Sequence, residues 1–125
     1  MDEKGDEEFP RRGEIWLVET PDKPDDPHQP RPALLVSENV RNRLAHDAIV
    51  VPIFSRGRLG PTRVPIQAGE GGLRNDGIVF VEEITTLHHG FLVDGPIGPP
   101  VRPSLLERVV RAVRRAIGDV RPEPR

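Results

Sequence analysis

The chain has 125 residues, of which 35% are apolar, and this suits a single domain with one modest hydrophobic core. It contains no cysteine, which excludes a disulfide framework, and no apolar run approaches the roughly 20 residues of a membrane span. The formal net charge is −2, but residues 1–9 hold five acids and one lysine, so the remaining residues carry a charge of +2 that permits contact with nucleic acid.

The expected secondary structure begins after a polar, acidic segment. Residues 1–10 are predicted to be a disordered acidic tail rather than a signal peptide, which favours a cytoplasmic protein. The apolar pattern then predicts β-strands over 14–19, 33–37, 48–54, 63–67, 77–81 and 91–93. The strand at 33–37 is continuous in apolar residues, so we expect it to be buried on both faces. Trp16 in the first strand is available as a core anchor.

The segments between these strands are rich in turn-forming residues. Residues 20–30 carry a proline at every third position, a period that matches polyproline II, and the segment is either a stiff exposed loop or a dedicated partner motif. Residues 38–47 are polar and allow a short helical turn. Residues 55–62, rich in glycine and arginine, are expected to form a mobile loop, and 68–76 a second turn-rich loop.

The C-terminal part of the chain changes to a helical period. Ser104 and Glu107 have the spacing of a capping box, and the apolar residues that follow fall on one helical face. Gly118 is suited to end this helix, and 119–125 would be a flexible tail. The arginines on the outer helix face are either simply solvated or contact nucleic acid. Short strands followed by one amphipathic helix predict a small β-barrel with a packed helix.

Arg31 and Pro32 stand directly before the apolar run of the second strand. Proline has no N–H to donate to a sheet, but it is tolerated at the first position of a strand. Arg31 would then be a fixed cation at the strand mouth, and its five N–H donors suit a phosphate.

Four segments carry a resemblance to a known family, and their order and spacing matter more than any one of them. They are Arg12-Gly13-Glu14-Ile15-Trp16, Arg31-Pro32-Ala33-Leu34-Leu35-Val36-Ser37, Val51-Pro52-Ile53 and Val81-Glu82-Glu83-Ile84-Thr85-Thr86-Leu87, with Asn39, Asn42 and Arg43 as further familial positions. Together they resemble the MazF/PemK family of toxin–antitoxin ribonucleases over residues 11–118.

The resemblance implies a mainly β fold with a C-terminal helix, an SH3-like barrel of the MazF/PemK/CcdB type. It implies a homodimer that cleaves single-stranded RNA at short sequences without a metal ion or other cofactor. It further implies an antitoxin that inhibits the enzyme by laying an acidic, extended peptide across the RNA groove.

One position of this chain departs from the family pattern. In the family, the arginine of the Arg-Pro step and a threonine that ends the third strand flank the scissile phosphate. Arg31 matches the first and would stabilise the charge that develops on the phosphate. The second is Phe54, because the family's Pro-Ile-Thr-Ser reads Pro52-Ile53-Phe54-Ser55 here. Strand alternation would turn Ser55 away from the Phe54 side, but a bulge would let Ser55 act as a second catalytic residue.

Several other side chains are candidate RNA contacts. Phe54 either stacks on an unpaired base or fills the core or the dimer interface. His28 lies in the proline-rich loop near Arg31, where it is either an acid–base group or merely exposed. Arg56, Arg58 and Arg63 would contact the RNA backbone or stay solvated, and Glu83 and Thr86 complete the predicted set. A metal site at the adjacent His88 and His89 is not expected, because neighbouring strand residues point to opposite faces.

Two other functions remain open from the sequence. The first is a family member without catalysis that binds RNA or an antitoxin peptide, because Phe54 supplies no hydroxyl. The second is a protein-directed poison like the gyrase-directed CcdB toxins, which act through a C-terminal helix and tail. Residues 118–125 of this chain offer no comparable apolar anchor.

Overall fold

The computed structural model describes residues 8–120, so most of the predicted acidic tail and residues 121–125 lie outside the described part. The strands are β1 (Ile15–Val18), β2 (Arg31–Leu35), β3 (Asp47–Phe54), β4 (Arg63–Ile66), β5 (Gly77–Phe80), β6 (Thr85–His88) and β7 (Leu92–Asp94). The helices are α1 (Asn39–Leu44) and α2 (Pro103–Ala116), with short 3-10 turns η2 (Glu70–Gly72), η3 (Val81–Glu83) and η4 (His89–Phe91). The expected mainly β class with a C-terminal helix is confirmed.

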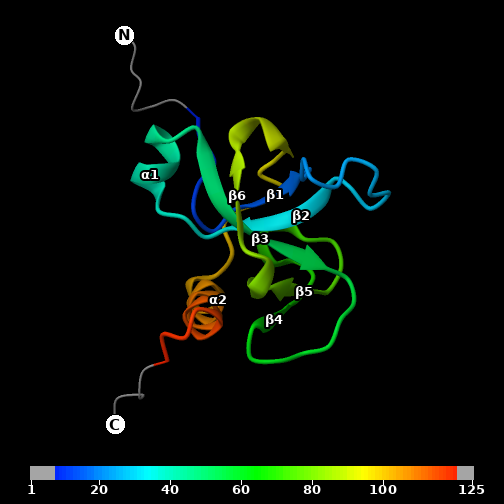
Figure 1. Cartoon of the computed structure of the whole chain (residues 1–125), viewed down its shortest axis with the longest axis vertical. Helices are drawn as coiled ribbons and strands as arrows, with labels where there is room; N and C mark the ends of the chain where they lie inside the picture. The colour runs from blue at the N-terminus through cyan, green and yellow to red at the C-terminus, as the bar shows by residue number, and fades with distance from the viewer. Residues whose placement is uncertain (1–7, 121–125) are drawn as a thin grey trace.

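β3 is the strand on which the whole sheet is organised (Figure 1). One edge of β3 pairs antiparallel with β2, and the other edge pairs with β6 near its start and with β5 near its end. The strands therefore follow the order β4-β5-β3-β2-β1-β7, with β6 added on β3. No pairing joins β4 to β7, so the barrel-like sheet stays open between its two terminal strands.

The core has two parts, one on each side of β2. Leu34 packs with Ile15, Val51 and the inner face of α2, whereas Ala33 and Leu35 pack in a second cluster on the other side. The expected burial of this strand on both faces is therefore confirmed. Trp16 is half-buried against the second cluster, and its indole N–H donates to Glu14 Oε1 at 2.9 Å.

The two ends of α2 differ in how well the sequence predicted them. The capping box is wrong, because the helix begins at Pro103 and its N-cap, Arg102, forms no side-chain cap bond. Proline suits this first position because its ring presets the helical φ angle. Instead, the backbone N–H of Arg102 donates to Glu70 Oε1 at 3.2 Å. The prediction for Gly118 is confirmed, since its φ of +83° lets the Asp119 N–H reach the Arg114 carbonyl at 2.7 Å.

The strand β6 was not among the predicted strands. Its residues Thr85 and Thr86 pair with Val50 and Ile49 of β3. The polar side chains of this short strand give little apolar alternation, which explains the wrong prediction. Neither α1 nor α2, the helices of the described residues 8–120, is long and apolar enough to cross a bilayer.

The proline period in residues 20–30 corresponds to successive β-turns, so the polyproline II prediction is wrong. The backbone N–H groups of Lys23, Asp26 and Gln29 donate to the carbonyls of Thr20, Lys23 and Asp26, at 3.1, 3.2 and 3.3 Å. Each turn has a proline directly after its first residue, where the fixed φ of proline favours a turn. Polyproline II has no such internal hydrogen bonds. The loop thereby folds back on itself and carries Asp26 to the start of β2.

His89 predicts a pH dependence of stability. Its Nε2 atom is buried and has no hydrogen-bond partner among residues 8–120. Burial, more than any other cause, lowers the pKa of His89 below its ordinary value. The unfolded chain therefore takes up a proton more readily, and we expect the free energy of unfolding to fall as the pH drops below about 6.5.

Urea unfolding at several pH values measures this effect. His89→Phe should flatten the pH dependence between neutral and mildly acidic solution, because it removes the buried imidazole. An unaltered slope in the His89 variant would contradict the assignment.

Candidate functional site

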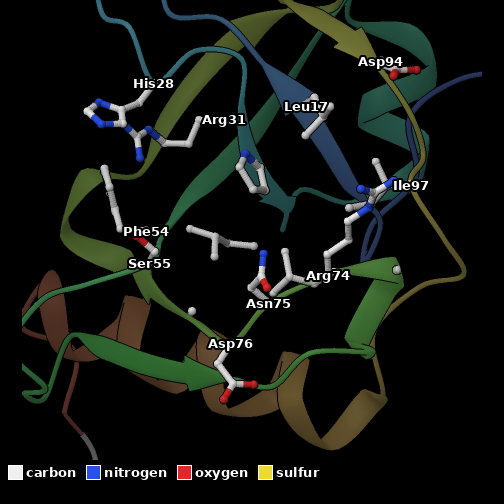
Figure 2. Close-up of a pocket in the computed structure, with 15 residues that line it drawn as sticks. Leu17, His28, Arg31, Phe54, Ser55, Arg74, Asn75, Asp76, Asp94 and Ile97 are labelled. Carbon is white, nitrogen blue, oxygen red and sulfur yellow. The ribbon is translucent and has the colours of Figure 1, made fainter.

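Arg31 lies in the wall between two open cavities. The larger has a volume of about 600 Å³ and the smaller one of about 300 Å³. Arg31 and Phe54 line both. Figure 2 shows the larger cavity, with Arg31, Phe54 and Ser55 on one side and Arg74 and Ile97 across from them. The cation that the sequence singled out is thus reachable from solvent on either side.

The position of Arg31 follows from the start of β2. Arg31 is the first residue of this strand and pairs with Val18 of β1, and Pro32 pairs with Leu17. The Arg31 side chain is 21% exposed. Its Nη2 atom lies 3.3 Å from Asp26 Oδ2, and its Cζ atom lies 4.2 Å from the centre of the Phe54 ring. The remaining guanidinium N–H groups can still meet a phosphate.

Asp26 connects the proline-rich loop to Arg31. The backbone N–H of His28 donates to Asp26 Oδ1 at 2.9 Å, and this bond is the main cause that holds the pKa of Asp26 below its ordinary value. The bond from Arg31 lowers the same pKa further. Asp26 therefore stays ionised at neutral pH. The His28 ring lies 3.3 Å from the same carboxylate, is 76% exposed and lines the larger cavity.

The Phe54 ring has two close neighbours, Arg31 and Phe80. Arg31 lies over one face, and Phe80 packs on the ring with centroids 4.4 Å apart and an interplanar angle of 49°. A base that stacked on the ring face covered by Arg31 would have to displace this guanidinium.

Ser55 lines the larger cavity beside Phe54 (Figure 2). We expected strand alternation to turn Ser55 away unless a bulge intervened. β3 ends at Phe54, so alternation no longer applies to Ser55, and the exposed hydroxyl reaches the cavity without a bulge.

The other predicted contacts divide into two groups. Glu83 and Thr86 line the smaller cavity, on the far side of Arg31 from Ser55. Arg56 and Arg58 are exposed in the loop between β3 and β4 and line neither cavity.

The sequence reasoning missed the loop before β5. Arg74, Asn75 and Asp76 line the larger cavity, because the pairing of Ile78 with Phe54 brings this loop beside Ser55. The only sequence signal was a run of three polar residues that follows two glycines and Leu73. Ordinary turns have the same pattern, so it did not indicate a functional site.

Comparison with known families decides what this fold is. Residues 11–117 match the family model described as PemK-like, MazF-like toxin of type II toxin-antitoxin system. The chain belongs to this toxin family. Comparison with curated protein sequences finds no match.

Solved structures of the same kind superpose on this PemK-like, MazF-like toxin. An endoribonuclease from a mycobacterial species is 27% identical, with a TM-score of 0.73, and the match covers 90% of this chain and 95% of the other. An endoribonuclease in complex with its cognate antitoxin, also mycobacterial, is 28% identical with a TM-score of 0.74, covering 90% and 99%. The MazE–MazF complex from Deinococcus radiodurans is 19% identical with a TM-score of 0.71, covering 90% and 99%, and supports the fold.

Within this toxin fold, the larger cavity is lined by charged groups of both signs, Arg31 and Arg74 with Asp76 and Asp94. Across residues 8–120, no three histidine, aspartate or glutamate side chains gather as metal ligands. The guanidinium-bearing residues Arg31 and Arg74 line this cavity from opposite sides, with Ser55 on the side of Arg31. Such donors suit a phosphodiester.

Proposed function

We propose that this protein is an endoribonuclease that cleaves single-stranded RNA at the cleft around Arg31, as the toxin of a toxin–antitoxin pair in the cytoplasm. The observation that carries the proposal is the partly exposed guanidinium between two open cavities. The mycobacterial relatives named as endoribonucleases support it, since they match this chain over 90% of its length.

The proposed reaction needs only groups of the RNA and the protein. The 2′-oxygen attacks the adjacent phosphorus, and the bond to the 5′-oxygen of the next nucleotide breaks. The products are a 2′,3′-cyclic phosphate and a 5′-hydroxyl, so the 2′-hydroxyl loses a proton and the leaving oxygen gains one. Arg31 stabilises the charge on the non-bridging oxygens. Ser55 takes the place of the family's threonine as the second donor to the phosphate.

The two cavities define a path for the RNA on either side of Arg31. His28 and the edge of Phe54 would contact the nucleotide in the larger cavity. Glu83 and Thr86 would contact the neighbouring nucleotide in the smaller cavity. Arg56 and Arg58, which are exposed beyond the end of β3, would contact the backbone outside the cleft. We assign the antitoxin peptide to the same cleft, because an acidic chain complements its arginines, and we assign a homodimer as the working form.

The direct test is incubation of the full chain with single-stranded RNAs of varied sequence in excess EDTA. We expect cleavage that EDTA does not slow, with products that end in a cyclic phosphate. Ser55→Ala should lower kcat by about a hundredfold, because a positioned polar group supplies a factor of this order. Ser104→Ala, an exposed serine on α2, is the matched control and should cleave normally.

Intact RNA at high protein concentration would overturn the assignment. It would favour the family member without catalysis instead, since Phe54 supplies no hydroxyl.

A further inference from the structure

Four side chains from four strands form one continuous stack that begins at Arg31. The guanidinium of Arg31 lies 4.2 Å from the Phe54 ring centre, and the Phe54 and Phe80 centroids are 4.4 Å apart. Arg63 closes the stack, with its Cζ atom 3.9 Å from the centre of the Phe80 ring. These distances place both arginines in cation–π contact. We call this set, Arg31, Phe54, Phe80 and Arg63, the arginine–phenylalanine stack.

Each end of the stack is held by a carboxylate. Asp26 accepts a bond from Arg31, as described above. Glu82 Oε2 accepts bonds from Arg63 Nη2 at 2.6 Å and Nε at 2.9 Å, and Thr62 donates to the other oxygen at 3.0 Å. Two bonds from one guanidinium to one carboxylate fix the plane of Arg63. The bonds to Glu82 therefore hold the Arg63 guanidinium in place over the Phe80 ring.

The loop between β3 and β4 docks on the far end of the stack. Gly57 has a φ of +152°, and a Cβ atom there would lie 2.5 Å from Cζ of Phe80. Only glycine permits this approach of the loop backbone to the ring. Arg63 Nη1 also donates to the Arg58 carbonyl at 3.2 Å. The loop that carries Arg56 and Arg58 thus rests on Phe80 and Arg63.

We propose that Phe54 and Phe80 are positioning residues that hold the Arg31 guanidinium toward the scissile phosphate, and that Gly57 and Arg63 link the loop between β3 and β4 to this position. The proposal rests on the proposed endoribonuclease function. An arginine side chain is long and flexible, and a ring on one face with a carboxylate at one edge leaves its other N–H groups in a fixed direction. Phe54 therefore supplies no hydroxyl of its own, but it orients the neighbouring guanidinium of Arg31.

Orientation of this kind has a measurable effect on rate. A catalytic group displaced by about 1 Å can lose on the order of a hundredfold in rate. Phe80 lines neither cavity, so a change there acts on the phosphate through its neighbours, namely Phe54 with Arg31 and the loop that rests on Phe80. A variant at Phe80 therefore tests the positioning of Arg31 without removing a direct contact with RNA.

The test compares Phe80→Leu with Phe91→Leu. Phe91 is half-buried in the second core cluster, outside the stack, and controls for the loss of a phenyl ring. We expect Phe80→Leu to lower kcat by about ten- to a hundredfold with little change in KM, whereas Phe91→Leu leaves kcat unchanged. Arg63→Gln should lower kcat in the same way, and Arg63→Lys, which keeps a cation over the ring, should restore part of it.

A second readout does not depend on cleavage. The Nε–H resonance of Arg31, assigned by its loss in Arg31→Lys, is shifted by the ring current of Phe54. We expect Phe80→Leu to move this resonance and Phe91→Leu to leave it in place. If the wild type cleaves RNA and Phe80→Leu reduces kcat no more than Phe91→Leu, or leaves the Arg31 resonance unmoved, the stack does not position Arg31. If the wild type does not cleave RNA, the proposed function fails, and the resonance alone then decides whether the stack holds Arg31.

Discussion

Arg31→Ala is expected to lower the rate of RNA cleavage by about a hundred- to a thousandfold. The loss of one preorganised donor to a developing anion typically has this effect. In this protein Arg31 lines both cavities, whereas Arg74 lines only the larger one. Steady-state cleavage of a labelled oligonucleotide in EDTA measures the loss.

Two further variants separate the charge of Arg31 from its shape. Arg31→Lys keeps a cation but loses the planar fork, and we expect an intermediate rate. Arg43→Ala removes an exposed arginine of α1, which lines neither cavity, and should cleave like the wild type. A fully active Arg31→Ala would show that the reaction takes place elsewhere on the protein and would remove the basis for the proposed site.

Much of this fold can be read from local sequence patterns, and the exceptions have physical causes. The continuous apolar run of β2 predicted burial on both faces, because Leu34 packs in one core cluster and Ala33 and Leu35 pack in the other. β6 was not predicted, because its sequence lacks an apolar alternation and its strand conformation depends on pairing with β3. The proline period fits both polyproline II and repeated β-turns, and only the hydrogen bonds distinguish them.

The site could be predicted only where one segment carried the signal by itself. Arg31 is such a case, because Pro32 fixes where the strand begins and therefore where the cation stands. The arginine–phenylalanine stack is the opposite case. Phe54 and Phe80 lie far apart in the chain, and they meet because β3 pairs with β5 in one register. The loop with Arg74 and Asn75 reaches the cavity through that same pairing.

Asn42→Ala is expected to cause the largest loss of stability among the variants considered, about 2–4 kcal/mol in the free energy of unfolding. Asn42 is fully buried in α1. The Ser37 hydroxyl donates to its Oδ1 atom at 2.5 Å, and its Nδ2 atom donates to the Ser37 carbonyl at 3.0 Å. The Ser37 hydroxyl oxygen in turn accepts a hydrogen bond from the backbone N–H of Ile49 at 2.9 Å. Removing the amide leaves buried polar groups of Ser37 without partners.

The comparison that isolates this network uses three variants and urea unfolding. Arg43→Ala, at the next position of the same helix, is exposed and should change stability little. Ser37→Ala should also be destabilising, because it leaves the Ile49 N–H unpaired. The double variant should lose less than the sum of the two single losses, since both act on one set of hydrogen bonds. Strictly additive losses would mean that the two residues stabilise the fold independently, and that α1 is held to the sheet by its other contacts.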